Sequence, residues 1–172
     1  MMERDARCRG VMTQTGYCSP RPSASTARSA GCPVRDWPLR CTTARPRSRT
    51  WRRAPPRVWC ILDQYVLKRE IGSRKTMADQ VRRLIDVARR PNVTIQVITD
   101  TTHCGLSGAF YLAETKSGQR IAYLETSADG STTEEPDTVL DQETRFATLM
   151  TVALRAKESL EFLERMLDEW TD

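Results

Sequence analysis

The side chains that build a protein core are almost confined to the second part of this 172-residue chain. Residues 1–58 contain four Leu, Ile, Val or Phe, whereas residues 59–172 contain 28. Ordering a residue costs roughly 1 to 2 kcal/mol of conformational entropy, and four such side chains cannot offset that cost over the whole segment. The sequence therefore predicts a disordered N-terminal segment, residues 1–54, followed by one folded domain, residues 55–172.

The charge divides at the same place. Residues 1–58 hold 13 arginines, no lysine and 3 acidic residues, a net charge of +10, while residues 59–172 hold 14 basic and 19 acidic residues, a net charge of −5. An acidic domain gives no electrostatic reason to expect DNA binding, but the arginine-rich run before it can contact phosphates and stack on bases. The candidate nucleic-acid contacts are Arg47, Arg49, Trp51, Arg52 and Arg53.

A second hypothesis concerns the origin of residues 1–54. Arginine without lysine, mixed with Pro, Ala, Ser, Thr, Cys and Trp, is typical of a GC-rich gene translated out of frame. The segment is then either a genuine basic arm or an out-of-frame product, and translating the other two frames of the same DNA distinguishes them.

The cysteines and the hydropathy of the chain indicate in which cellular compartment the protein resides. No window approaches the roughly 20 consecutive apolar residues of a membrane span, and the N-terminus lacks the apolar core of a secretory signal. We therefore expect a cytoplasmic protein whose six cysteines are free thiols. The spacing of Cys8, Cys18, Cys32 and Cys41 lacks the close pairs that hold zinc, so we expect no metal site there.

The domain shows alternating strand and helix signals. The apolar run 58–62 predicts a buried strand, the stripe of apolar residues from Met77 to Ala88 predicts a helix capped by Thr76, and 93–98 alternates as a half-buried strand does. The acidic stretch 129–137 is typical of a loop.

The remaining signals predict a hairpin and C-terminal helices. Strands over 109–115 and 120–126 are joined by a tight turn in which Gly118 suits a left-handed residue. Pro136 suits the first turn of a helix, and the apolar spacing after it continues to Trp170 as one long helix or as two that meet near Ala156. We predict an α+β fold with a small mixed sheet of about four strands and helices on one face.

The sequence contains few residues that could form a catalytic site. His103 is the only histidine, and a nucleophile pair with the adjacent Cys104 is disfavoured because neighbouring residues rarely face each other. Asp63, Glu114 and Glu125 stand near strand ends, so a small hydrolase using Asp63 and Glu125 remains a third, weaker hypothesis. No phosphate-binding glycine loop occurs. We expect a protein that is not an enzyme and has no cofactor or metal.

The polar loop after the strand 93–98, residues 99–108, is the best candidate for recognition, because loops on a rigid sheet commonly carry binding sites. The alternative is an ordinary connection between strands. The candidate residues for a partner or effector surface are His103, Gly105, Gly108 and Glu125.

Four motifs in order resemble a known family. Pro55 to Gly72 reads PPRVWCILDQYVLKREIG, Pro91 to Ile98 reads PNVTIQVI, Gly105 to Phe110 reads GLSGAF, and Tyr123 to Thr126 reads YLET. Over residues 55 to about 168 the chain resembles the domain of unknown function that follows an XRE-type helix-turn-helix in antitoxin-like transcriptional regulators of actinobacteria.

The resemblance implies a regulatory module whose partner is a small protein encoded nearby or a small effector. The chain departs from the family pattern because it lacks both the helix-turn-helix and the helical entry to the domain, and because Arg155-Ala156-Lys157 replaces a Ser-Pro-type start of the last helix. DNA binding then depends on the missing helix-turn-helix or, weakly, on the basic arm. The alternative function is a non-specific nucleic-acid-binding protein that uses that arm.

Overall fold

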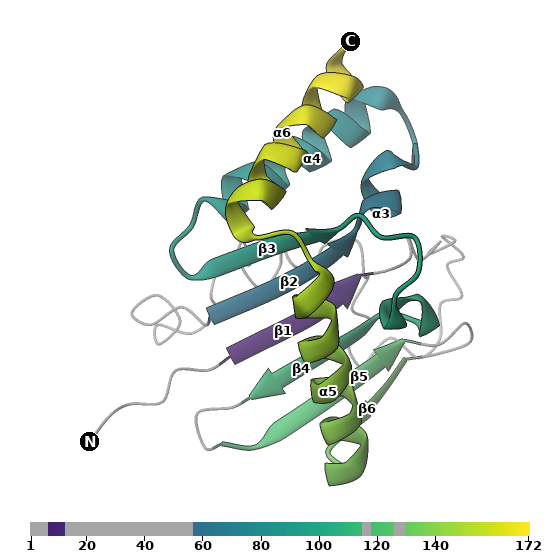
Figure 1. The fold of residues 1–172 in the computed structure, drawn as a ribbon, viewed down its shortest axis with the longest axis vertical. Helices are drawn as coiled ribbons and strands as arrows, with labels where there is room; N and C mark the ends of the chain where they lie inside the picture. The colour runs from purple at the N-terminus through teal and green to yellow at the C-terminus, as the bar shows by residue number, and fades with distance from the viewer. Residues whose placement is uncertain (1–6, 13–56, 115–117, 126–129) are drawn as a thin grey trace, which may run out of the picture.

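The structure is a computed structural model that describes residues 7–12, 57–114, 118–125 and 130–172. These residues form one six-stranded sheet with helices packed on it (Figure 1). The strands are β1 (Arg7–Met12), β2 (Arg57–Asp63), β3 (Val93–Ile98), β4 (Phe110–Glu114), β5 (Arg120–Glu125) and β6 (Gly130–Thr133). The helices are α3 (Gln64–Lys68), α4 (Arg74–Ala88), α5 (Pro136–Val152) and α6 (Ala156–Thr171), and a 3₁₀ turn, η2, spans Cys104–Ser107.

The sheet is mixed, as predicted, and its strand order is β3-β2-β1-β4-β5-β6. The β3, β2 and β1 strands are parallel to one another, and β4, β5 and β6 continue the sheet in antiparallel pairs. The parallel strands need a crossover connection, which the α3 and α4 helices provide between β2 and β3. The α+β class of the prediction is confirmed.

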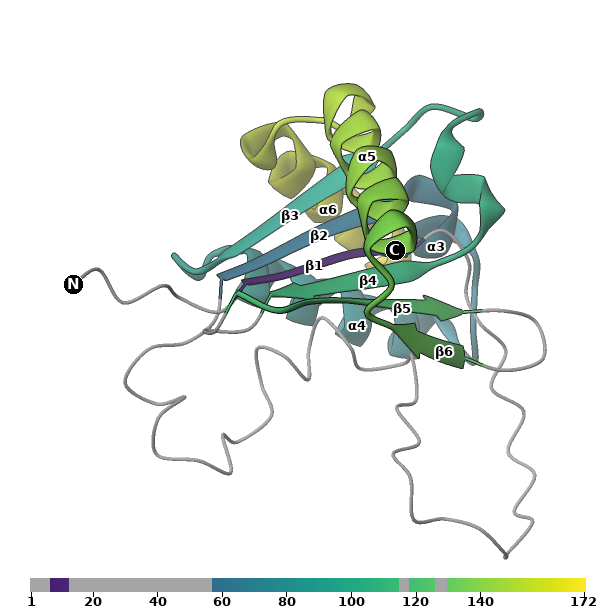
Figure 2. The ribbon, with the colours of Figure 1, turned by 90° about the horizontal axis from the view of Figure 1, so that it is seen from below.

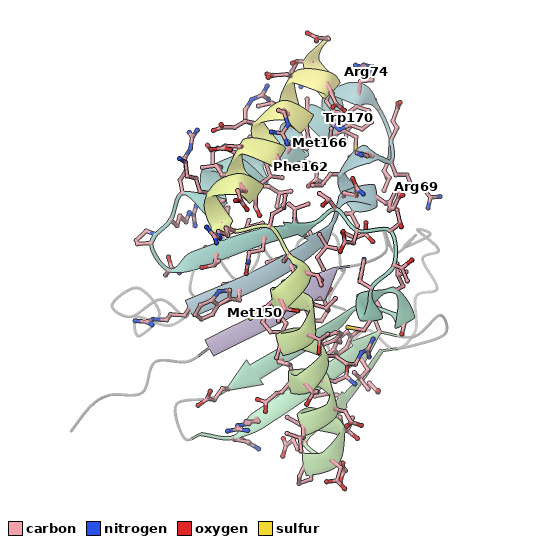
Figure 3. All side chains as sticks on the ribbon, in the orientation of Figure 1. Arg69, Arg74, Met150, Phe162, Met166 and Trp170 are labelled. Atoms are coloured by element: carbon pink, nitrogen blue, oxygen red, sulfur yellow. The ribbon has the colours of Figure 1, made fainter. Side chains whose placement is uncertain are left out.

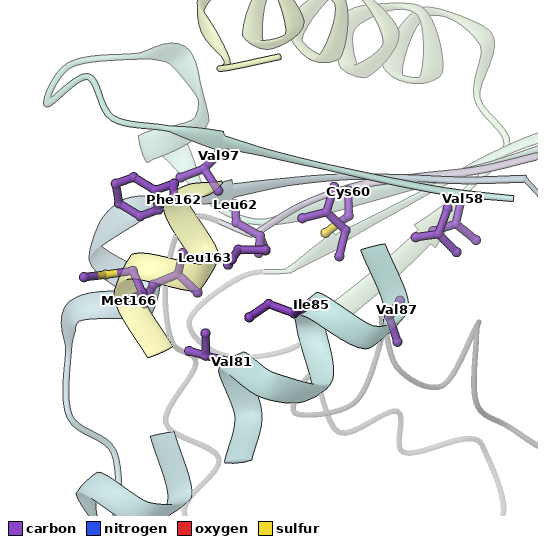
Figure 4. Packing of buried hydrophobic residues seen from close by; sticks show 13 residues of the cluster. Val58, Cys60, Leu62, Val81, Ile85, Val87, Val97, Phe162, Leu163 and Met166 are labelled. Atoms are coloured by element: carbon purple, nitrogen blue, oxygen red, sulfur yellow. The ribbon is translucent and has the colours of Figure 1, made fainter. Parts of the chain in front are cut away.

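One hydrophobic cluster lies between the sheet and the pair α4 and α6 (Figure 4). Alternate residues of β2 enter it, because successive side chains of a strand point to opposite faces. The α4 residues Val81 and Ile85 and the α6 residue Leu163 meet them from the helices, and Val81 and Leu163 are completely buried. The two helices lie side by side over β2 and β3.

A second cluster occupies the opposite face of the sheet. Ile61 of β2, Phe110 of β4 and the α5 residues Phe146 and Leu149 belong to it. Figure 2 shows α5 on one side of the sheet and α4 on the other. The sheet therefore carries helices on both faces and not on one face as the sequence predicts, and the all-apolar run of β2 is explained because this strand is buried on both sides.

The chain passes from one face to the other at the β3 edge of the sheet. The Leu154 amide donates to the Val97 carbonyl (2.9 Å), and the Val97 amide donates to the Ser159 hydroxyl (3.0 Å). The Gln96 side-chain amide also donates to the Leu154 carbonyl (2.9 Å). These bonds satisfy the outward backbone groups of an edge strand, and they separate α5 from α6, so the C-terminal region forms two helices.

Two turn predictions are confirmed and one cap prediction is wrong. Gly118 has a φ of +87° in the hairpin connection, and Pro136 occupies the start of α5. The α4 helix, however, is capped by Ser73, whose hydroxyl accepts a hydrogen bond from the Thr76 amide (3.2 Å). The apolar stripe begins at Met77, one turn inside the helix, and this offset makes the predicted start too late.

Strands β1 and β6 were not expected. The β6 strand lies within the acidic stretch predicted as a loop, and β1 lies within the segment predicted to be disordered. The β1 backbone pairs with β2 from Arg7 to Met12 and with β4 from Arg7 to Val11, so it occupies the middle of the sheet. The rest of residues 1–54 lies outside the described residues.

Candidate functional site

Asp63 ends β2 and starts the next helix. Its side chain accepts a hydrogen bond from the Tyr65 amide at 2.7 Å and so caps α3. Short polar side chains are preferred at the N-cap position of a helix because they accept a hydrogen bond from a backbone amide that has no partner within the helix. Asp63 is 2% exposed, and a buried carboxylate requires further hydrogen-bond donors.

His103 supplies the second donor from 40 residues further along the chain. Its Nε2 donates to the Asp63 Oδ2 at 3.1 Å, and the two side chains are 2% and 1% exposed. The other ring nitrogen, Nδ1, is buried without a hydrogen-bond partner among the described residues. The contact fastens the 99–108 loop to the carboxyl end of β2.

The neighbouring Gln64 also connects the start of α3 to the 99–108 loop. The Gln64 side-chain amide donates to the Thr99 carbonyl, and the Gln64 Oε1 accepts from Lys68 Nζ at 2.8 Å. Gln64 is buried although it is polar, which is consistent with both ends of its amide being bonded. The β2–α3 junction thus holds the loop at two points.

The η2 turn is attached to α5. Arg145 donates through its guanidinium to the Cys104 carbonyl (3.0 Å) and to the Gln142 Oε1 (2.9 Å). The same guanidinium lies 5.1 Å from the centre of the Phe110 ring, a distance at which a cation is attracted to an aromatic face. Through Arg145 the loop is bound to both α5 and β4.

The last part of the loop reaches β5. Gly108 has a φ of +133°, which L residues rarely adopt, and the Glu125 amide donates to the Ala109 carbonyl at 3.2 Å. A Cβ on Gly108 would lie 3.5 Å from the Glu125 carbonyl oxygen. Partial burial raises the pKa of the Glu125 carboxyl above its ordinary value.

The four predicted surface residues therefore belong to one loop and strand edge but differ in exposure. The His103 side chain and Gly105 are buried, while Gly108 and Glu125 are partly exposed. Their role in binding stays a prediction. The residues that the loop presents to solvent are Asp100, Thr101, Thr102, Cys104, Leu106 and Ser107. Leu106 is 43% exposed, and this exposed apolar residue was not singled out from the sequence.

The carboxylates of the hydrolase hypothesis do not converge. Asp63 and Glu125 lie at the carboxyl ends of β2 and β5, which are on the same side of the sheet. The strands β1 and β4 lie between them, and three strand spacings amount to about 14 Å. Paired catalytic carboxyls of glycosidases lie within roughly 10 Å. Glu114 pairs with Arg120 at the opposite end of the sheet. The geometry gives this hypothesis no support.

Charged residues and potential metal ligands outside the loop were also located. Within the described residues, no group of three or more His, Cys, Asp or Glu is arranged to hold a metal ion. Part of the basic face of α4 is neutralised, because Asp79 pairs with Lys75 and Arg82, both at 2.9 Å, and the lysine holds the pKa of that carboxyl below its ordinary value. The five candidate nucleic-acid contacts between residues 47 and 53 lie outside the described part of the chain.

Comparison with protein families identifies the domain. A family model described as Domain of unknown function (DUF5753) matches residues 23–165. The chain belongs to the DUF5753 family. The match begins inside the N-terminal segment, so the proposed division at residue 54 stays a prediction. No curated protein and no solved structure matches the chain significantly. None of the helices in the described ranges is long and apolar enough to cross a membrane.

Proposed function

We propose that this DUF5753 domain is the partner-binding or effector-binding module of an antitoxin-like transcriptional regulator of the XRE helix-turn-helix class. The four sequence motifs that resemble actinobacterial regulators support this proposal. In this proposal the protein is cytoplasmic and has no catalytic activity, and its ligand is a small protein encoded nearby or a small effector.

The 99–108 loop carries the proposal. Hydrogen bonds with Asp63, Gln64 and Arg145 hold the loop against the sheet and α5, while Leu106 stays 43% exposed. A preorganised loop loses little conformational entropy when it binds, so more of the contact energy appears as affinity. Burial of this leucine against a partner would remove apolar surface from water and so favour binding.

Co-purification with the small proteins encoded beside the gene tests the proposal. The full chain is co-expressed with each of them, and the dissociation constant of any complex is measured by calorimetry. Leu106→Asp is expected to weaken the complex at least tenfold, since it places a charge in a desolvated contact. Leu140→Asp on α5, where the leucine is 58% exposed, is the matched control. A complex that responds to the control and not to Leu106→Asp would refute the assignment of the loop.

The alternative, a non-specific nucleic-acid-binding protein, is favoured by one observation. Residues 1–58 carry a net charge of +10, and arginines that neutralise phosphates give an affinity that falls steeply with salt. Deleting the segment is unsuitable as a test, because it removes β1 from the centre of the sheet. The appropriate variant replaces Arg47, Arg49, Arg52 and Arg53 by glutamine.

Filter binding of duplex DNA at two salt concentrations then decides between the two functions. The alternative predicts salt-sensitive binding that the quadruple variant loses. The regulatory module predicts weak binding that the variant leaves unchanged, because the folded part carries a net charge of −5.

A further inference from the structure

We propose that residues 34–39, in the middle of the connection from β1 to β2, pack on an aromatic surface that β4 and β5 present on the α4 side of the sheet. The proposal names a segment of the same chain as the occupant, and it is independent of the function assigned to the 99–108 loop. The surface is called the tyrosine face, and its members are Tyr111, Ala113, Ile121 and Tyr123.

The strand register places the tyrosine face on the same side of the sheet as α4. Cys60 belongs to the cluster between the sheet and the pair α4 and α6, and directly paired residues of neighbouring strands point to the same side. Cys60 pairs with Gly10 of β1, and Gly10 pairs with Tyr111. Tyr111 in turn pairs with Tyr123. A second row, which starts at Val58 of the same cluster, brings in the other two members.

The tyrosine face is buried or half-buried, although α4 and α6 lie over β2 and β3. There Phe162 and Met166 of α6 (labelled in Figure 3) join the first cluster, which includes no described residue of β4 or β5. Tyr111 is only 5% exposed and belongs to neither cluster. Its ring centre lies 5.7 Å from that of Tyr123, so two large rings form a continuous apolar surface beside the first cluster.

The handedness of the fold directs the connection from β1 to β2 over this surface. The two strands are parallel and adjacent, so the chain leaves β1 at Met12 and returns to the opposite end of the strands at Arg57. Crossovers between parallel strands are right-handed in about 98% of cases. The crossover from β2 to β3 makes the same sideways step along the sheet and contains α4. Two crossovers of the same hand and the same step use the same face. Because α4 and α6 occupy β2 and β3 there, the remaining path lies over β1 and β4.

The composition of the connection selects the part that packs. The connection, residues 13–56, lies outside the described residues, and its only Leu, Ile, Val or Phe residues are Val34 and Leu39. Trp37 and Pro38 stand between them, near the midpoint of the connection. Because the connection starts at one end of the strands and finishes at the other, its midpoint passes over the middle of the face. A tryptophan buries a large area, and its pairing with tyrosine rings is favourable beyond that area.

A surface that already exists lowers the cost of ordering this group. The N-terminal segment has too few apolar side chains for a core of its own, but packing on a preformed face orders only the residues that make contact. Both ends of the connection are held by the pairing of β1 with β2, which keeps the group close to the face. The candidate nucleic-acid contacts, residues 47–53, then lie between this fixed point and the start of β2, at the opposite end of the sheet from the 99–108 loop.

Limited proteolysis of the full chain by trypsin tests the proposal. Arg35 and Arg40 lie within the group and directly after it, whereas Arg28 and Arg49 lie outside it. Peptide mass spectrometry gives the initial cleavage rate at each arginine, and a synthetic peptide of residues 13–56 gives the unprotected rates. Cleavage after Arg35 and Arg40 is expected to be at least about tenfold slower in the protein than in the peptide, and cleavage after Arg28 and Arg49 nearly unchanged. Peptide-like rates at all four sites, or equal slowing at all four, overturn the proposal.

Three variants examine the two sides of the contact. Trp37→Ala removes the largest apolar side chain of the group, and Ile121→Asp places a charge in the tyrosine face. Each is expected to restore the peptide rate after Arg40. Trp51→Ala is the matched control, because it removes the other tryptophan of the connection and should leave the protection intact. Thermal unfolding monitored by circular dichroism identifies a variant that fails to fold, and Trp37→Ala decides the outcome if Ile121→Asp is such a variant. Protection that survives in a folded variant, or that Trp51→Ala also removes, contradicts the proposal.

A cross-link tests the contact directly. Cys32 and Cys41 flank the group, and Ile121→Cys adds a thiol to the tyrosine face. A short bismaleimide is expected to join this thiol to Cys32 or Cys41 within one molecule. The matched control is Leu140→Cys, on the exposed side of α5 and on the other face of the sheet, which should give no such link. Equal linkage from both variants, no linkage from Ile121→Cys, or linkage only between two molecules rejects the proposed packing.

Discussion

Replacing Asp63 by alanine tests how the candidate site is held together. The variant loses the cap of α3, which costs about 0.5 to 2 kcal/mol. It also leaves the buried Nε2–H of His103 without an acceptor, which costs about 1 to 3 kcal/mol. Because both contacts involve the same carboxylate, the expected loss in the free energy of unfolding is the sum, about 1.5 to 5 kcal/mol. Asp63→Asn keeps an oxygen for the cap and should lose about half as much.

Urea denaturation followed by circular dichroism measures these free energies. Asp100→Ala, at an exposed position near the start of the same loop, is the control and should stay within about 0.5 kcal/mol of the wild type. A double-mutant cycle of Asp63→Ala with His103→Ala isolates the contact between them and should give a coupling of at least about 1 kcal/mol. A coupling near zero, or an Asp63→Ala variant as stable as the control, would refute the view that this contact fastens the loop.

Three further predictions concern two buried residues and the partly exposed Glu125. Ser159→Ala leaves the Val97 amide without an acceptor, so chemical denaturation should show a loss of about 1 to 3 kcal/mol, and a loss under about 0.5 kcal/mol contradicts this. Burial raises the pKa of the Cys60 thiol to about 12. Iodoacetamide should therefore label the exposed Cys104 in the native protein but Cys60 only after unfolding, and peptide mass spectrometry measures both. Rapid labelling of Cys60 in the native protein would contradict the prediction. Folding raises the pKa of the Glu125 carboxyl above its ordinary value of 4.5, so the folded state binds this proton more tightly than the unfolded state does. The stability that this proton adds is therefore present below pH 4.5 and is lost as pH rises through the raised pKa. The Glu125→Gln variant should therefore gain stability relative to the wild type over that window, and a pH-independent difference between the two in melting experiments tells against it.

The locally encoded parts of the fold were readable from the sequence. The apolar run of β2, the amphipathic stripe of α4 and the alternation of β3 each depend on residues that are close in the chain. Such periodicity reports which face of an element is buried. The break between α5 and α6 was left open because the contacts that cause it, from Val97 and Gln96 to Leu154, come from a distant strand.

The sequence by itself predicted that most core side chains come from the second part of the chain, because the number of apolar side chains in each part does not depend on the fold. It also determined the α+β class and the motifs of the DUF5753 family. Only the tertiary structure decided that β1 is a central strand, since its six residues, RCRGVM, show no alternating pattern and acquire their conformation by pairing with β2 and β4. The tertiary structure also decided which residues come together at the candidate site. A single histidine has no assignable partner in a sequence, and only the folded sheet brings His103 to Asp63, which lies 40 residues earlier in the chain.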